Sequence, residues 1–322
     1  MDCDHSGTVF TIDCNYLFPE FAAAYLIVEG DRAAFVDNNT NRAAPLLLAA
    51  LEEQGLKPGN VQYLIVTHAH LDHAGGTSAM AEACPGATLI AHPRAARHII
   101  EPSRLIKGVK AVYGEQKYLE LYGEIKPVDA GRVKAVEHDE TLAWGGRELR
   151  FIHTLGHASH HMVIVDSGSN AVFTGDAFGL AYPLFQKGGR PFIFPSTSPP
   201  EFDPGEAKTS IRKIAETGAA TAFPTHFGAF ARVEEGASMM LGNIDRMDEI
   251  LQQAVESGFE GADLESFSSD RMTRFFTAEL EKRGLHLSGA AAQLLETDIR
   301  LNAMGISAAA QRMKKRSAAA GQ

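Results

Sequence analysis

Cysteine is scarce in this chain of 322 residues, which carries only Cys3, Cys14 and Cys84. Three widely spaced cysteines form neither a disulfide framework nor a CxxC metal site, and we expect them to be reduced thiols. Long apolar segments are missing as well, because no run of about 18 apolar residues occurs. The first residues do not show the basic and then apolar pattern of a signal peptide. The sequence therefore predicts a cytoplasmic protein with no membrane partner.

Positive charge is also in deficit, since the formal net charge is -10 and the isoelectric point lies near 5.7. This argues against nucleic acid as the main partner, because nucleic acid requires a basic footprint. The G-x-S-x-G and GxGxxG patterns of serine hydrolases and dinucleotide-binding proteins are missing too. With 45% hydrophobic and 22% charged residues, the chain has the composition of a globular protein with one large domain or two unequal ones.

The most informative stretch reads T-H-A-H-L-D-H-A-G-G, over residues 67–76. It follows residues 63–66, a short apolar segment of the kind that forms a buried strand. Imidazole nitrogens and carboxylate oxygens suit zinc, iron or manganese. So many ligands are too crowded for one tetrahedral ion with an open position, and we expect two adjacent ions. A surface loop that binds metal adventitiously is the alternative, which the buried strand disfavours. The candidate ligands are His68, His70, Asp72 and His73.

Three further strand ends carry residues that bind metals. His157 stands at a strand-to-loop junction and is a candidate to complete the ligands of the first ion, with His161 orienting it from outside the ligand set. Asp176 also follows an apolar strand, where a carboxylate could bridge two ions, although a lone Gly-Asp is more typical of a helix N-cap. His226 ends another strand and would be uninformative by itself.

Together these stretches resemble the metallo-β-lactamase-fold hydrolase superfamily, which includes glyoxalase II and quorum-signal lactonases. The matching stretches are HAHLDH at 68–73, GHASHH at 156–161, TGDA at 174–177 and PTHFG at 224–228. The resemblance covers residues 8–232. It implies an α/β (α+β) fold, the αββα metallo-β-lactamase sandwich, with a dinuclear metal site along one edge.

The resemblance also implies how the ions are held and used. It implies that the ligands of the first ion are His68, His70 and His157. The ligands of the second ion would be Asp72, His73 and His226, and Asp176 would bridge the two ions. The cofactors would be two divalent ions, with zinc favoured over iron or manganese. A hydroxide bridging the ions would attack an ester-type bond of a small-molecule substrate: a thioester, a lactone or another carboxylic ester. Asp72 would act catalytically by handling a proton.

The segment 178–202 is rich in aromatic residues and prolines, and we interpret it as a wall or lid over the metals. An ordered loop whose aromatics cover their own core or a dimer contact is the alternative. The expected substrate-pocket residues are Tyr182, Phe185, Phe192 and Phe194, which would offer apolar surface, and Lys187 and Arg190, which would meet a carboxylate or phosphate. Gly179 stands where lactonases of this fold carry a tyrosine, and the segment lacks the cysteine typical of glyoxalase II, so neither activity transfers.

Three alternatives keep the same fold. The first is a di-iron oxygen-binding or redox-sensing protein, although flavodiiron proteins usually carry Glu where this chain has His70. The second is a phosphodiesterase. The third is a regulatory protein that acts through partners.

The composition changes after Gly228. Helical patterns cover residues 234–256, 264–283 and 289–304. We therefore predict a metallo-β-lactamase-fold domain over 1–232 and a helical C-terminal domain with a basic tail over 233–322. The tail is expected to fray from residue 311. The C-terminal helices would cap the substrate entrance or form a homodimer contact.

Overall fold

The computed structural model describes residues 2–3, 7–186, 191–197 and 199–320. The chain forms two compact units. The first comprises Met1–His153, His160–Gly175 and Ile214–Val233, and the second comprises Thr154–Ser159, Asp176–Lys213 and Glu234–Gln322. The second unit thus contains residues 176–213 in addition to the C-terminal helices. The domain boundary after residue 232 stays a prediction.

Among the described residues of the first unit, seven strands form one sheet in the order β1-β2-β3-β4-β5-β6-β7. They are β1 (Asp2–Cys3), β2 (Val9–Asp13), β3 (Ala23–Glu29), β4 (Arg32–Val36), β5 (Val61–Val66), β6 (Thr88–Ala91) and β7 (Val133–Ala135). Strands β1 to β4 pair antiparallel, and β4 to β7 pair parallel. Because β4 and β5 are parallel neighbours, the residues that follow Val36 and Val66 leave the same edge of the sheet.

The second sheet of the first unit has the order β12-β11-β10-β9-β8 within the described ranges. Its strands are β8 (Thr141–Trp144), β9 (Arg147–His153), β10 (Met162–Asp166), β11 (Ala171–Gly175) and β12 (Thr221–Pro224). Strands β8 to β11 pair antiparallel, and β12 runs parallel to β11. Gly145 takes φ +61° in the turn between β8 and β9, a left-handed conformation that suits glycine.

The two sheets face each other across a core of apolar side chains. Tyr25 and Ile65 of the first sheet join Phe151, Phe173 and Phe223 of the second in this core. Every other side chain of each strand points inward, which buries one face of both sheets. This two-sheet arrangement confirms the predicted α/β sandwich.

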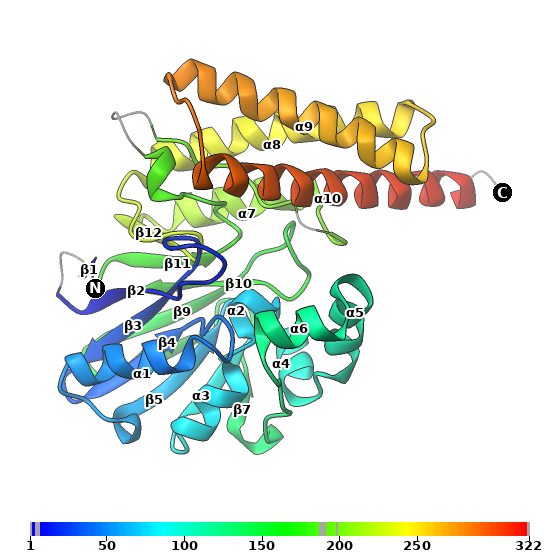
Figure 1. Cartoon of the computed structure of the whole chain (residues 1–322). Helices are drawn as coiled ribbons and strands as arrows, with labels where there is room; N and C mark the ends of the chain where they lie inside the picture. Colours follow the sequence, from blue (N-terminus) through cyan, green and yellow to red (C-terminus); the bar gives the residue numbers. More distant parts are fainter. Residues whose placement is uncertain (1, 4–6, 187–190, 198, 321–322) are drawn as a thin grey trace. The chain divides into compact units, whose positions relative to one another are not determined.

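Helices cover the other face of the first sheet (Figure 1). They are α1 (Ala44–Glu53), α3 (Thr77–Ala83) and α4 (Pro93–Ile100). Leu47 of α1 and Met80 of α3 are fully buried against strand residues such as Leu64. The remaining helical elements of this unit are α2 (Leu71–Ala74), α5 (Ser103–Tyr113), α6 (Glu115–Tyr122) and the 3-10 turns η1 (Pro58–Asn60) and η2 (Ala130–Arg132).

The second unit is mainly helical. Its elements are the 3-10 turn η3 (Pro183–Phe185), α7 (Pro204–Glu216), whose last residues belong to the first unit, and α8 (Val233–Glu256), α9 (Gly261–Arg283) and α10 (Ala290–Ala320). Helices α9 and α10 pack along each other (Figure 1), and the Ser307 hydroxyl lies 3.0 Å from the Ser268 hydroxyl between them. The predicted helical C-terminal region is thereby confirmed.

The expectation that the C-terminal tail frays from residue 311 is wrong, because α10 continues to Ala320. Residues 305–320 are rich in alanine, the best helix former. Ile306 and Ala310 are buried, and the Lys314 ammonium donates to the Phe259 carbonyl oxygen at 2.7 Å. Tertiary contacts thus extend a helix whose apolar pattern in the sequence ends earlier.

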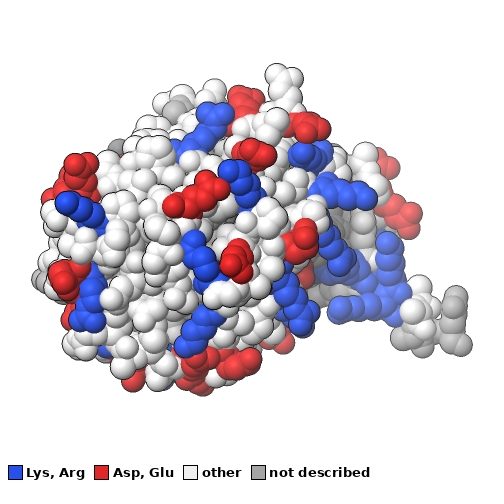
Figure 2. All heavy atoms as spheres, turned by 90° about the horizontal axis from the view of Figure 1, so that it is seen from below, with Lys and Arg blue, Asp and Glu red and all other residues white. Residues whose placement is uncertain are grey.

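Charged side chains of both signs are interspersed over most of the face in Figure 2. The net negative charge therefore does not gather in a single patch on this face. None of the described helices combines the length and the apolarity needed to span a membrane.

A largely buried ion network joins the two sheets at Arg147, the first residue of β9. Its Nε donates to Glu29 Oε2 at 2.9 Å and its Nη1 to Asp166 Oδ2 at 2.6 Å. The hydrogen bond from the Gly146 N–H, followed by that from Arg147, lowers the pKa of Glu29. Arg147 and Asp166 are both buried, so each neutralises a charge that water cannot reach.

Replacing this arginine is expected to destabilise the fold. Arg147→Met would leave Asp166 buried without its cation, which costs about 3–5 kcal/mol of unfolding free energy. The matched control is Arg150→Met on the same strand, because Arg150 forms an exposed pair with Asp139 at 3.6 Å. That change should cost at most about 1 kcal/mol. Urea denaturation of both variants tests the prediction, and equal losses would refute it.

Candidate metal centre

The candidate metal loop, residues 67–76, leaves the end of β5 and enters the short helix α2. A Cβ at Gly75 would lie 2.3 Å from the Leu71 carbonyl oxygen and 3.1 Å from that of Asn39, and one at Gly76 would lie 2.4 Å from that of Asn38. The two glycines therefore allow the loop to pack against the backbone that follows β4. The Asn38 N–H donates to the His73 carbonyl oxygen at 2.9 Å and holds the loop there.

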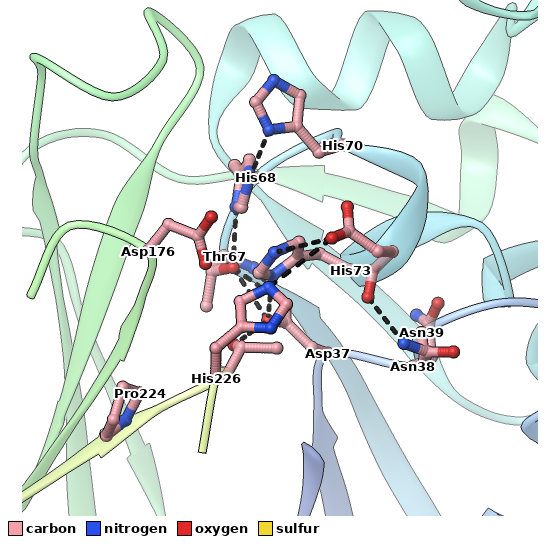
Figure 3. Close-up of polar contacts among 12 residues, drawn as sticks. Asp37, Asn38, Asn39, Thr67, His68, His70, His73, Asp176, Pro224 and His226 are labelled. Carbon is pink, nitrogen blue, oxygen red and sulfur yellow. Dashed lines mark hydrogen bonds and ion pairs between the residues drawn. The ribbon is translucent and has the colours of Figure 1, made fainter. Parts of the chain in front are cut away.

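In two imidazole rings of this loop, one ring nitrogen forms a hydrogen bond with an oxygen atom of the protein (Figure 3). His73 Nδ1 lies 2.9 Å from Asp37 Oδ2, and His68 Nδ1 lies 3.1 Å from the Thr67 hydroxyl oxygen. Because the Thr67 hydroxyl donates to Asp37, the His68 Nδ1–H is the donor to Thr67. Both rings thus carry their proton on Nδ1 and present Nε2 as a lone-pair nitrogen, the form that binds a metal. His70 Nδ1 lies 2.9 Å from His68 Nε2.

The segment after β12 adds a further candidate ligand, His226, to this group. His226 Nδ1 donates to the Phe21 carbonyl oxygen at 2.7 Å, and its Nε2 lies 3.5 Å from Asp72 Oδ2. His73 Nε2 lies 3.9 Å from the same carboxylate oxygen. The ligand atoms of Asp72, His73 and His226 lie within 4.8 Å of one another. This set of imidazole nitrogens and a carboxylate oxygen fits a divalent ion such as zinc, iron or manganese.

The second unit holds the remaining two candidate ligands, His157 and Asp176. The His157 ring donates through Nδ1 to the Ser196 carbonyl oxygen at 3.1 Å, and its Nε2 lies 3.5 Å from Asp176 Oδ2. Both side chains are buried, at 5% and 6% exposure. Gly156 makes this approach possible, since a Cβ there would lie 2.2 Å from the Ala207 nitrogen at the start of α7. The His157 ring is therefore fixed by a backbone acceptor, as the rings of the first unit are.

Asp37 is a buried residue beside the candidate ligands that our sequence reasoning missed. Its buried carboxylate accepts hydrogen bonds from the Thr67 N–H at 2.8 Å, from the Thr67 hydroxyl, from His73 Nδ1 and from the Thr225 hydroxyl at 2.8 Å. Asp37 therefore orients His73 directly and His68 through Thr67 (Figure 3). The available signal in the sequence was an acidic residue directly after the buried strand β4.

The expected orienting role of His161 stays a prediction. The His161 side chain is fully buried, and its ring centroid lies 4.8 Å from that of His68. A Cβ at Gly175 would come within 2.6 Å of His161 Nε2 and 2.8 Å of the Thr67 hydroxyl oxygen. Glycine at the end of β11 thus leaves room for both side chains. His160 Nδ1 accepts a hydrogen bond from the Ala69 N–H at 3.2 Å.

The aromatic residues expected to line a substrate pocket lie in the interior of the second unit. These residues, Tyr182, Phe185, Phe192 and Phe194, all have 0% exposure. The Phe194 ring meets that of Phe276 in α9 edge-on at a centroid distance of 4.9 Å. Their role in substrate binding stays a prediction, and their burial favours the alternative that they cover their own core. Lys187 and Arg190 lie outside the described residues.

Comparison with curated proteins finds relatives that are similar to part of this chain. The chain is 28% identical over 169 residues to the metallo-beta-lactamase fold-containing protein ST1585 of Sulfurisphaera tokodaii, a match that covers 51% of this chain and 60% of that protein. It is 27% identical over 154 residues to the probable metallo-hydrolase YybB of Bacillus subtilis, covering 48% of this chain and 60% of YybB. The matches thus span less than two thirds of the length of either relative.

The chain is also similar to solved structures and matches a family model. The crystal structure of ST1585 from Sulfolobus tokodaii aligns with a TM-score of 0.65 and 20% identity, covering 95% of this chain and 99% of that one. The structure of TTHA1429 from Thermus thermophilus aligns with a TM-score of 0.62 and 20% identity, covering 97% and 94%. At such identity the likeness shows the fold alone. The model of the metallo-beta-lactamase superfamily matches residues 17–226, and the chain belongs to this superfamily of metal-binding, mostly hydrolytic proteins.

Proposed function

We propose that the chain is a dinuclear metal-dependent hydrolase of an ester-type bond: a thioester, a lactone or another carboxylic ester. The main support is the group of Asp72, His73 and His226 in the first unit, with ligand atoms within 4.8 Å of one another. Both imidazoles have Nδ1 committed to a protein oxygen, so Nε2 is the nitrogen left for a metal. A superfamily whose members are mostly hydrolases agrees with this function.

In this proposal His68, His70 and His157 would hold one ion, Asp72, His73 and His226 would hold the other, and Asp176 would contribute to both. The covalent chain supports the assignments of Asp176 and His157. Asp176 is bonded directly to Gly175, the final residue of β11 in the first unit. His157 lies on a short segment between His153 and His160, which both belong to the first unit.

The metal ions, when bound, supply Lewis acidity and lower the pKa of a water molecule to about 7. The protein's own contribution is to fix the ligand rings and to move a proton. We assign the proton transfer to an Asp72 carboxylate oxygen. The Asp72 side chain is 28% exposed, whereas that of Asp176 is 6% exposed, so only the former can exchange a proton with substrate and solvent.

Elemental analysis combined with a substrate screen tests this function. The purified protein should contain two divalent ions per chain, with zinc as the expected metal. It should hydrolyse a thioester, a lactone or an aryl ester faster than an aryl phosphodiester. Chelation should abolish hydrolysis, and added zinc should restore it. An iron protein whose visible absorption responds to oxygen, with no hydrolysis, would overturn the proposal.

A further inference from the structure

Inside the second unit, one peptide group links the ring of His157 to the helix α10. The carbonyl oxygen of this group belongs to Ser196 and accepts from His157 Nδ1 at 3.1 Å. Its N–H belongs to Thr197 and donates to Asn302 Oδ1 at 2.8 Å. The carbonyl and the N–H of a planar trans peptide group point in opposite directions. A helix residue that holds this N–H therefore also aims the carbonyl oxygen at the histidine ring.

The side-chain amide of Asn302 is itself fixed by its neighbours. Asn302 Nδ2 donates to the Asp298 carbonyl oxygen, one turn earlier in α10, at 2.9 Å. Because a carbonyl only accepts and an N–H only donates, these two partners leave Oδ1 as the amide atom that faces Thr197. The Thr197 hydroxyl adds a second tie, 2.9 Å from the Asn302 carbonyl oxygen. Asn302 thus holds the peptide group between Ser196 and Thr197 in one orientation.

The backbone of α10 lies against the same segment at Gly305. A Cβ at Gly305 would collide with the Thr197 carbonyl oxygen. Glycine is less favourable than alanine in the interior of a helix, and this close approach accounts for it here. Asn302 and Thr197 are 3% and 0% exposed, so water does not compete for the hydrogen bonds between them.

The hydrogen bonds form a chain from Asn302 Oδ1 through the peptide group to His157 Nδ1. Hydrogen bonds in such a chain polarise one another, so the Asn302 oxygen makes the Ser196 carbonyl a stronger acceptor. That carbonyl keeps the proton of the neutral His157 ring on Nδ1. His157 Nε2 is then the lone-pair nitrogen, and it is the ring nitrogen that lies 3.5 Å from Asp176 Oδ2.

We propose that Asn302 is a positioning residue of the metal centre, which holds the His157 ring in the tautomer and orientation that bind a metal. This inference rests on the proposed function, because it takes His157 as a metal ligand. It gives α10 a role in metal binding that neither a cap over the substrate entrance nor a dimer contact requires. Asn302 acts through the peptide group and takes no part in the chemical step.

The zinc affinity of the full-length protein, measured by chelator competition, tests this role without turnover. Asn302→Leu removes the acceptor of the Thr197 N–H and should raise the zinc Kd about 10–100-fold. Asn243→Leu is the matched control, because Asn243 is also buried and donates from α8 to the Ile193 carbonyl oxygen of the same segment, at 2.8 Å. Both variants should lower Tm, but Asn243→Leu should keep the zinc Kd within about twofold.

Two further readings separate positioning from packing. Asn302→Asp keeps an oxygen that can accept from the Thr197 N–H, so it should bind zinc as tightly as the natural chain even if its Tm falls. In NMR spectra of the zinc-loaded protein labelled with 15N-histidine, the His157 Nδ1 proton should exchange with solvent faster in Asn302→Leu than in Asn243→Leu. If Asn302→Leu does not fold, Asn302→Ala removes the same acceptor without added bulk, and the same two measurements decide.

Equal zinc Kd values in Asn302→Leu and Asn243→Leu would overturn the inference and leave the proposed function standing. An Asn302→Asp variant that binds zinc as weakly as Asn302→Leu would also overturn it, because the acceptor oxygen would then not be the cause. A natural chain that binds no zinc, iron or manganese would overturn the proposed function, and this inference with it.

Discussion

Asp176→Ala is expected to lose at least one of the two metal ions and nearly all turnover. Asp176 is the carboxylate that faces His157 Nε2, at 3.5 Å, and is the proposed bridge between the ions. Alanine removes both oxygens at once. Since changes to residues that merely orient a ligand cost about 10–100-fold in metal affinity or activity, the loss of a bridging ligand should exceed about 100-fold. Metal content per chain and kcat on the best ester measure the effect.

Two further variants separate ligation from packing at this position. Asp176→Asn keeps the volume and one neutral oxygen, so a purely structural Asp176 would tolerate it, whereas a bridging carboxylate would not. Asp245→Ala makes the same chemical change on the exposed surface of α8, where Asp245 pairs with Lys208 at 2.9 Å. That variant should keep two ions and its turnover within about twofold. Two retained ions and full activity in Asp176→Ala would contradict the bridging role.

The candidate ligands could be found from the sequence because each follows a strand whose apolar pattern is local. His68, Asp176 and His226 come directly or nearly directly after β5, β11 and β12, and strand ends bring side chains to one edge of a sheet. The dense H-x-H-x-D-H spacing further indicated that these residues bind metal. The apolar spacing that predicts the helices α8 and α9 also lies within each segment. The predicted extents of these helices agree closely with the structure.

The features that could not be predicted from the sequence depend on contacts between segments that are far apart in the chain. The contacts of Asp37 form only once β4 lies beside β5 and Thr225 approaches from the end of β12. The burial of Phe194 depends on Phe276 of α9, far away in the chain. The positive φ angle of Leu17 could not be predicted from the sequence, because leucine is not a residue that favours positive φ.

Asp37→Asn is expected to weaken both metal binding and the fold. The Asp37 carboxylate accepts from Thr67, His73 and Thr225, and an amide replaces one acceptor oxygen by an NH2 group that faces these donors. A buried donor left without an acceptor costs about 1–3 kcal/mol in unfolding free energy. With His73 no longer held in the tautomer that presents Nε2, zinc affinity should fall about 10–100-fold. Denaturation of the metal-free protein and chelator competition measure the two effects separately.

Asp31→Asn provides the matched control, because Asp31 is exposed in the turn between β3 and β4. It should change the unfolding free energy by less than about 0.5 kcal/mol and leave zinc affinity unchanged. The measurement that decides the role of Asp37 is the zinc affinity, since loss of stability alone would follow from any damaged buried hydrogen bond. If Asp37→Asn unfolds more easily but binds zinc as tightly as the natural chain, Asp37 holds the sheet edge together and does not position His73.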